Sequence, residues 1–130
     1  MNPASEDVKD MLIDSDLGLT FATDLFIGKE PANPDDTVTI FDTPGGAVGR
    51  TLDVGADMEE PAIQIRVRNN GYMEGYAVAK NIQELLHNRA QETVNGSLYS
   101  AIHCTQGPAL LDWDENVRAR FVMTFNIMRR

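Results

Sequence analysis

The C-terminal stretch, residues 115–130, alternates between apolar and polar side chains, and this pattern constrains the fold more than any other part of the chain. Alternation with a period of two residues is typical of a long strand that buries one face. A long strand ending in Arg-Arg favours a scaffold or an assembly surface over a catalytic device. The apolar odd positions are Val117, Ala119, Phe121, Met123, Phe125 and Ile127, and the even positions include Arg118, Arg120, Thr124 and Asn126.

Length and charge narrow the class of protein. A chain of 130 residues predicts a single domain over residues 1–130. Its net charge of −9 argues against a general nucleic-acid binder, which needs basic groups to displace counterions from phosphates. The acidity either serves solubility alone or keeps a surface from adhering to DNA that passes nearby. We expect no signal peptide and no membrane association, because the chain lacks a basic segment followed by an apolar run and its apolar stretches are short.

Apolar residues at helical spacing predict two helices. The first covers residues 5–15, with Ser5 as its N-cap. The second runs from about Tyr72 to His87. Its predicted buried face consists of Tyr72, Tyr76, Ala79, Ile82 and Leu86.

Strands are predicted from β-branched residues and period-two alternation, and the Asn95-Gly96 pair predicts a hairpin turn. The resulting order is α-β-β-β-α-β-β. It predicts an α+β domain, with a mostly antiparallel sheet of about four to five strands and two helices packed on one face. The predicted strands cover residues 20–28, 37–43, 62–68, 97–105 and the C-terminal stretch.

Residues 44–61, rich in glycine and proline, predict a flexible loop. Its glycines superficially resemble a phosphate-binding loop, but no helix or Lys-Ser/Thr pair follows them. His87, His103 and Cys104 are the only soft metal ligands, too few for a zinc site. We therefore predict no catalytic residue, no cofactor-binding residue and no metal ligand.

Arginines on two strands are the main candidates for an interface. Arg66 and Arg68 lie on the polar side of one predicted strand, and Arg118 and Arg120 on that of the last. Paired strands would bring these like charges together, which is unfavourable without acidic partners. A neighbouring copy of this acidic chain could supply them, or the arginines are simply solvated. Trp113 either covers one end of the core or is an exposed anchor at a subunit interface.

Several short segments, taken in their order along the chain, together resemble the minor capsid proteins of long-tailed bacteriophages that serve as tail terminators. The resemblance covers roughly residues 15–130. It is carried by residues 24–28, 39–45 and 61–68, the Tyr-containing helix that ends in Glu84-Leu-Leu-His87, the turn at residues 94–96 and the final arginine-bearing strand.

The resemblance implies a structural virion protein without enzymatic activity or cofactor. Such proteins form a ring, commonly a hexamer, at the head-proximal end of the tail tube. They stop tube polymerisation and present the surface that joins the head. The implied partners are copies of the chain itself, the tail tube protein and the head–tail connector. DNA passes through the lumen without specific binding, and assembly takes place in the host cytoplasm.

Other interpretations fit the same sequence. A head-closure or adaptor protein of the phage neck could use a similar small domain. A small enzyme with a site built from scattered residues is a second alternative. A protein-binding module that uses an exposed sheet edge is a third.

Overall fold

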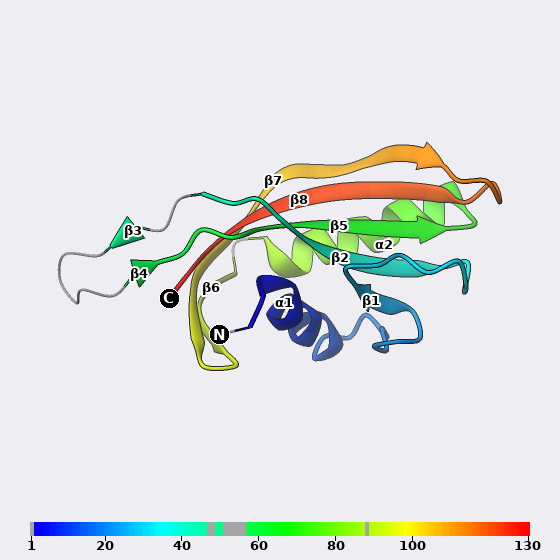
Figure 1. Ribbon diagram of the computed structural model, residues 1–130. Coiled ribbons are helices and arrows are strands. Elements are labelled where there is room, and N and C mark those ends of the chain that lie inside the picture. The colour runs from blue at the N-terminus through cyan, green and yellow to red at the C-terminus, as the bar shows by residue number, and fades with distance from the viewer. Residues whose placement is uncertain (1, 47–48, 51–56, 88) are drawn as a thin grey trace.

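A six-stranded sheet in the strand order β1-β2-β5-β8-β7-β6 carries the fold. The structure is a computed structural model that describes residues 2–46, 49–50, 57–87 and 89–130 (Figure 1). A short pair, β3 with β4, forms a separate sheet. The elements are α1 (Ala4–Ile13), β1 (Leu25–Ile27), β2 (Thr37–Thr43), β3 (Gly49–Arg50), β4 (Asp57–Met58), β5 (Ala62–Asn69), α2 (Tyr72–Leu86), β6 (Arg89–Val94), β7 (Ser97–Trp113) and β8 (Ala119–Arg129).

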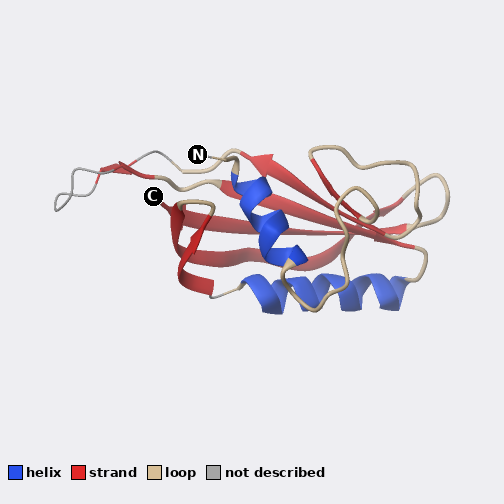
Figure 2. Cartoon of the chain, turned by 90° about the horizontal axis from the view of Figure 1, so that it is seen from below, coloured by secondary structure: helices blue, strands red, loops and turns tan. Residues whose placement is uncertain are grey.

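Both helices pack on the same face of the sheet, as predicted. In Figure 1 α1 lies below the strands and α2 lies behind them, and in Figure 2 α1 crosses the strands obliquely while α2 runs nearly along them. We call the opposite side the outer face. The pair β3–β4 extends beyond the sheet at the end where both termini lie (Figures 1 and 2).

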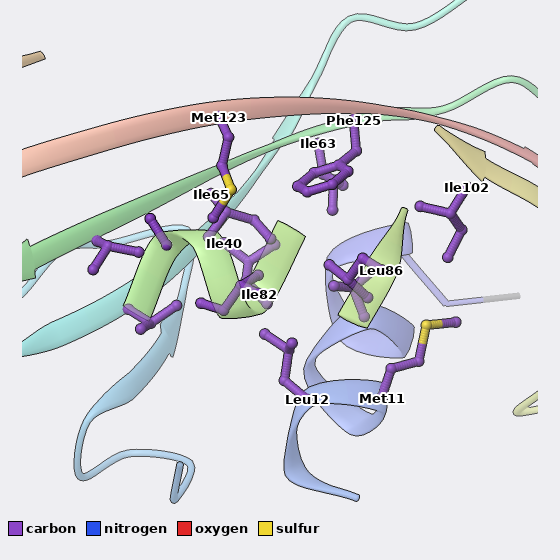
Figure 3. Close-up of a cluster of buried hydrophobic side chains, with 14 of the residues drawn as sticks. Met11, Leu12, Ile40, Ile63, Ile65, Ile82, Leu86, Ile102, Met123 and Phe125 are labelled. Carbon is purple, nitrogen blue, oxygen red and sulfur yellow. The ribbon is translucent and has the colours of Figure 1, made fainter. Parts of the chain in front are cut away.

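The hydrophobic core lies between the helices and the sheet (Figure 3). The predicted alternation of β8 places Phe121, Met123 and Phe125 on the helix side, each at most 1% exposed. Each such side chain contributes about 1.5–3 kcal/mol through burial. β5 and the helices add to the core Ile63, Ile65, Val67, Val8, Met11, Leu12, Ala79, Ile82 and Leu86.

The sheet differs from the prediction in strand number and in type. It has six strands instead of four to five, and it is mixed, because β1 pairs with β2 in parallel while the other neighbours are antiparallel. The extra strand, β6, is short and polar, so it carries no alternation that the sequence could reveal. It forms a hairpin with β7 through the predicted turn, where Asn95 and Gly96 both have positive φ.

Three strands have bounds clearly different from those predicted. β1 covers only Leu25–Ile27 of the predicted residues 20–28. β7 continues through Gly107 and Pro108 to Trp113, with register shifts against β8. β8 begins at Ala119, because Val117 has a φ of 58° and is 69% exposed, so it does not join the alternation.

Residues 44–61 include the paired strands β3 and β4. Within the predicted flexible loop, residues 47–48 and 51–56 lie outside the described residues.

Helix α1 starts one residue earlier than predicted, and Ser5 is not its N-cap. Ser5 instead lies in the first turn, where its backbone N–H and its hydroxyl donate to the two oxygens of Asp42, at 3.1 and 2.6 Å. A carboxylate at this position accepts hydrogen bonds from N–H groups that the helix leaves unpaired. It is also stabilised by the positive end of the helix dipole. Asp42 of β2 therefore fixes the start of α1 against the sheet.

Helix α2 packs tightly against the sheet at Gly75. A Cβ atom there would lie 2.8 Å from Cε2 of Phe121 and 3.0 Å from Cβ of Asn69. The prediction that Tyr72 and Tyr76 lie on the buried face of α2 was wrong. They are 45% and 38% exposed, and their rings contact the ring of Phe121 from its sides.

We predict that Gly75→Ala lowers the free energy of unfolding by about 1–3 kcal/mol, because the added methyl group overpacks the contact with Phe121. An alanine in an exposed helix would instead gain about 1 kcal/mol over glycine. Urea unfolding measures the effect, and Ala77→Gly on the exposed side of α2 reports helix propensity alone. An unchanged or higher stability of Gly75→Ala would contradict the close packing described here.

Candidate assembly interface

The pairing of β5 with β8 brings the predicted arginines together on the outer face. Arg68 lies opposite Arg120, and Arg66 lies opposite Val122. Arg118 directly precedes β8. The expectation that these guanidinium groups cluster on one side of the sheet is therefore confirmed.

Arg68 is buried beneath the segment of residues 28–36, which joins β1 to β2 and which we call the acidic loop. Its guanidinium group donates to Oε1 of Glu30 at 3.1 Å and to the carbonyl oxygens of Asp35 and Pro34 at 3.1 and 2.7 Å. Arg68 is only 4% exposed. Such a buried charge is tolerated only when it is paired and hydrogen-bonded.

Arg118 is equally buried, at 4% exposed, and ties the turn between β7 and β8 to the acidic loop. Its Nε donates to Oδ2 of Asp114 at 2.7 Å. Its Nη1 donates to the carbonyl oxygen of Ala32 at 2.7 Å and to Oδ1 of Asp35 at 3.2 Å. One side chain therefore joins two segments that are distant in the sequence.

Arg120 forms a two-pronged ion pair with Asp112 of β7. Its Nε and Nη2 each lie 2.5 Å from an oxygen of that carboxylate, and its Nη1 lies 3.4 Å from Glu30. The hydrogen bonds from Arg120 outweigh partial burial and hold the pKa of Asp112 below its usual value. Paired arginine and carboxylate groups of this geometry are stronger than single contacts.

Arg66 is placed differently from the other three arginines. Its Nε donates to Oε1 of Gln64 at 2.9 Å, and its guanidinium carbon lies 4.9 Å from the ring centroid of Phe41. A cation above an aromatic face is attracted by the ring quadrupole. Arg66 is half-buried on the outer face.

Acidic groups from the chain itself meet Arg68, Arg118 and Arg120, so no neighbouring copy is needed to neutralise these three arginines. Whether any of them contacts a partner stays a prediction. The acidic partners are Glu30, Asp35, Asp112 and Asp114.

Trp113, the last residue of β7, partly covers one end of the core, and its contact with a neighbouring subunit stays a prediction. Its ring stacks on Tyr72 of α2 at a centroid distance of 6.3 Å and an interplanar angle of 27°. Tyr72 in turn contacts Phe121 of the core. Trp113 nevertheless remains 47% exposed.

A buried polar network at the other end of the sheet was not predicted from the sequence. Asp7 of α1 is 0% exposed and accepts a hydrogen bond from the hydroxyl of Tyr99. Arg129 donates to that same hydroxyl at 3.1 Å and to Oε2 of Glu59 at 3.0 Å. Burial and the Asp7 hydrogen bond raise the pKa of Tyr99. One signal was available, because Arg129 occupies a core-facing position in the alternation of β8.

The two histidines lie near each other, with ring centroids 5.0 Å apart. Nδ1 of His87 accepts the backbone N–H of Cys104 at 3.0 Å. Among the described residues, no three His, Cys, Asp or Glu side chains converge to hold a metal ion. Within the same residues, neither helix is long and apolar enough to cross a membrane.

Comparison with known proteins places this geometry in a wider context. A model of the family described as bacteriophage tail terminator protein matches residues 12–129. No curated protein matches the sequence.

Two solved structures share the fold. A chain described as the virion of a native gene transfer agent particle aligns with a TM-score of 0.68 at 13% identity, covering 96% of this chain and 92% of that chain. A second, whose name states no function, aligns with a TM-score of 0.58 at 10% identity, covering 98% and 91%.

We predict that Glu30→Gln lowers the free energy of unfolding by about 1–3 kcal/mol, because it removes a charged partner from the buried Arg68. Chemical denaturation measures the change. Glu115→Gln, at an exposed position of the turn after β7, is the matched control and should alter stability by less than about 0.5 kcal/mol. Equal effects of the two substitutions would refute a stabilising role of the acidic loop.

Asp112→Asn should destabilise the protein at pH 7 and lose that effect in acid. The pKa of Asp112 is lowered in the folded state, so its pairing with Arg120 adds stability above the unfolded-state pKa of about 4, and this stability is lost as pH falls through the folded-state pKa. We expect a difference from wild type of up to about 1 kcal/mol at pH 7, since the carboxylate is partly exposed. Unfolding curves between pH 7 and about pH 2 measure it, and a difference independent of pH would contradict the assignment.

Proposed function

Because this chain belongs to the bacteriophage tail terminator protein family, we propose that it completes the phage tail. In this proposal copies of the chain form a ring, a hexamer, on the head-proximal end of the tail tube. The ring stops tube polymerisation and provides the surface that joins the head. The family match over residues 12–129 is the observation that carries this proposal.

The fold supports a structural role within the virion. The chain shares its fold, over nearly its whole length, with a protein of a gene transfer agent particle. Its buried charged side chains pair with other groups of the same chain, as Arg68 does with Glu30 and as Asp7 and Arg129 do with Tyr99. We therefore propose that the protein acts by contact with other virion parts and catalyses no reaction.

A ring requires a heterologous contact, in which two different surfaces of neighbouring copies meet and the rotation closes. The proposed partners are copies of the chain, the tail tube protein and the head–tail connector. DNA passes through the lumen without specific binding, because the net charge of −9 repels its phosphates. Assembly takes place in the host cytoplasm, and the mature location is the head-proximal end of the tail.

The predicted interface residues differ in burial. Trp113 and Arg66 keep exposed surface and can contact a partner directly. Arg68 and Arg118 are buried, so they act by fixing the acidic loop and the turn after β7. Arg120 is intermediate and joins β8 to both Asp112 and Glu30.

Particles that lack this protein should show tails of uncontrolled length and unattached heads, because nothing then stops the tube or joins it to the head. Electron microscopy of lysates with and without the gene measures both defects, and the wild-type gene supplied in trans should restore normal particles. Tails of normal length accumulating beside heads would point to the neck-adaptor alternative. Normal particles in its absence would refute a role in tail completion.

A further inference from the structure

Half of β7 forms an open edge of the sheet. β7 pairs with β8 from Tyr99 to Trp113, but β6 covers it only from Ser97 to Ile102. Over residues 103–113 no strand pairs with the other side of β7 in the described chain; we call this stretch the open edge. Figure 1 shows it along the upper side of the sheet, away from β6. His87 occupies its first backbone donor, the N–H of Cys104.

The open edge is uncharged over most of its length and carries exposed apolar side chains. Residues 93–111 contain no Asp, Glu, Lys or Arg and are the longest such run in the chain. The next longest, residues 121–128, lies on the adjacent β8. Leu110, Leu111 and Trp113 are 38%, 44% and 47% exposed.

Sheet edges that face only water usually carry charged side chains that prevent pairing with another chain. Here the register shifts and Pro108 limit the pairing, but no charge opposes contact before Asp112. Interface cores are likewise depleted of charge and enriched in aromatic residues. The open edge thus has the composition of a contact surface.

The net charge of this chain indicates which kind of partner binds the open edge. Two copies of a chain with a charge of −9 repel each other, and the repulsion is smallest where the touching surfaces carry no charge. A basic partner would gain more from the acidic surfaces elsewhere on the molecule. An uncharged edge on an acidic protein therefore fits a second copy of the same chain better than a basic partner.

We propose that the open edge of β7 is the surface through which one copy of this chain contacts the next. Leu111 and Trp113 bury apolar area against the neighbour, and backbone groups of residues 109–113 on the side away from β8 donate and accept hydrogen bonds across the contact. The opposite edge of the sheet is formed by the short, parallel β1. The two edges differ, which suits the heterologous contact of a ring. This inference rests on the proposed function only for the closure of that ring.

Sedimentation velocity over a concentration series tests the proposal with Leu111→Lys. Wild-type protein should associate, and Leu111→Lys should weaken association at least about tenfold, because a charge replaces apolar contact area. The control is Met73→Lys, which also replaces an apolar side chain with lysine but at a 71% exposed site on α2, and which should associate like wild type. The melting temperature confirms that each variant is folded, and Leu111→Thr, a milder change compatible with a strand, should give an intermediate effect.

Association of Leu111→Lys equal to that of wild type would overturn the proposal. So would wild-type protein that remains monomeric up to about 1 mM. If Leu111→Lys associates normally but fails to restore tails in complemented particles, the open edge binds another tail protein. In that case this inference fails while tail completion stands. Normal particles in the absence of the gene would instead refute tail completion and leave the association result untouched.

Discussion

The antiparallel pairing of β5 with β8 is the constraint on which the rest of the structure depends. Its register turns the odd-numbered residues of both strands toward the helices and the even-numbered ones, including Arg68 and Arg120, toward the outer face. A slip by one residue would exchange the two sides, placing arginines in the core and phenylalanines in water. The buried aromatic and aliphatic side chains make that exchange costly, so the register is strongly specified.

The same pairing creates the need for the acidic loop. Arg68 and Arg118 lie almost fully covered, and their charges require partners that also exclude water. Glu30 and Asp35 supply them from one side, and Asp114 from the turn after β7. The chain's own acids therefore cover the arginines of the outer face, whereas the open edge of β7 carries no Asp, Glu, Lys or Arg before Asp112. The division supports the proposal that copies meet at the edge and not at the arginines.

The parts of the fold that local sequence specifies were predictable. The alternation of β8, the spacing of α2 and the turn at Asn95-Gly96 each follow from neighbouring residues. β7 passes through Pro108 because an edge position requires no hydrogen bond on one side, a condition that local sequence does not reveal. The arginine cluster was predicted, but its partners were not, since Glu30 and Arg68 are 38 residues apart. The cap of α1 by Asp42 is a contact of the same long-range kind.

The central claim is that this protein works by fitting against copies of itself at one end of the tail. Single-particle imaging of purified tails at a resolution that traces β7 tests it most directly. We predict a closed ring of this chain at the head-proximal end, with the open edge of β7 against the next copy. Density for the chain elsewhere in the particle, or a ring whose contacts leave β7 facing solvent, would contradict it.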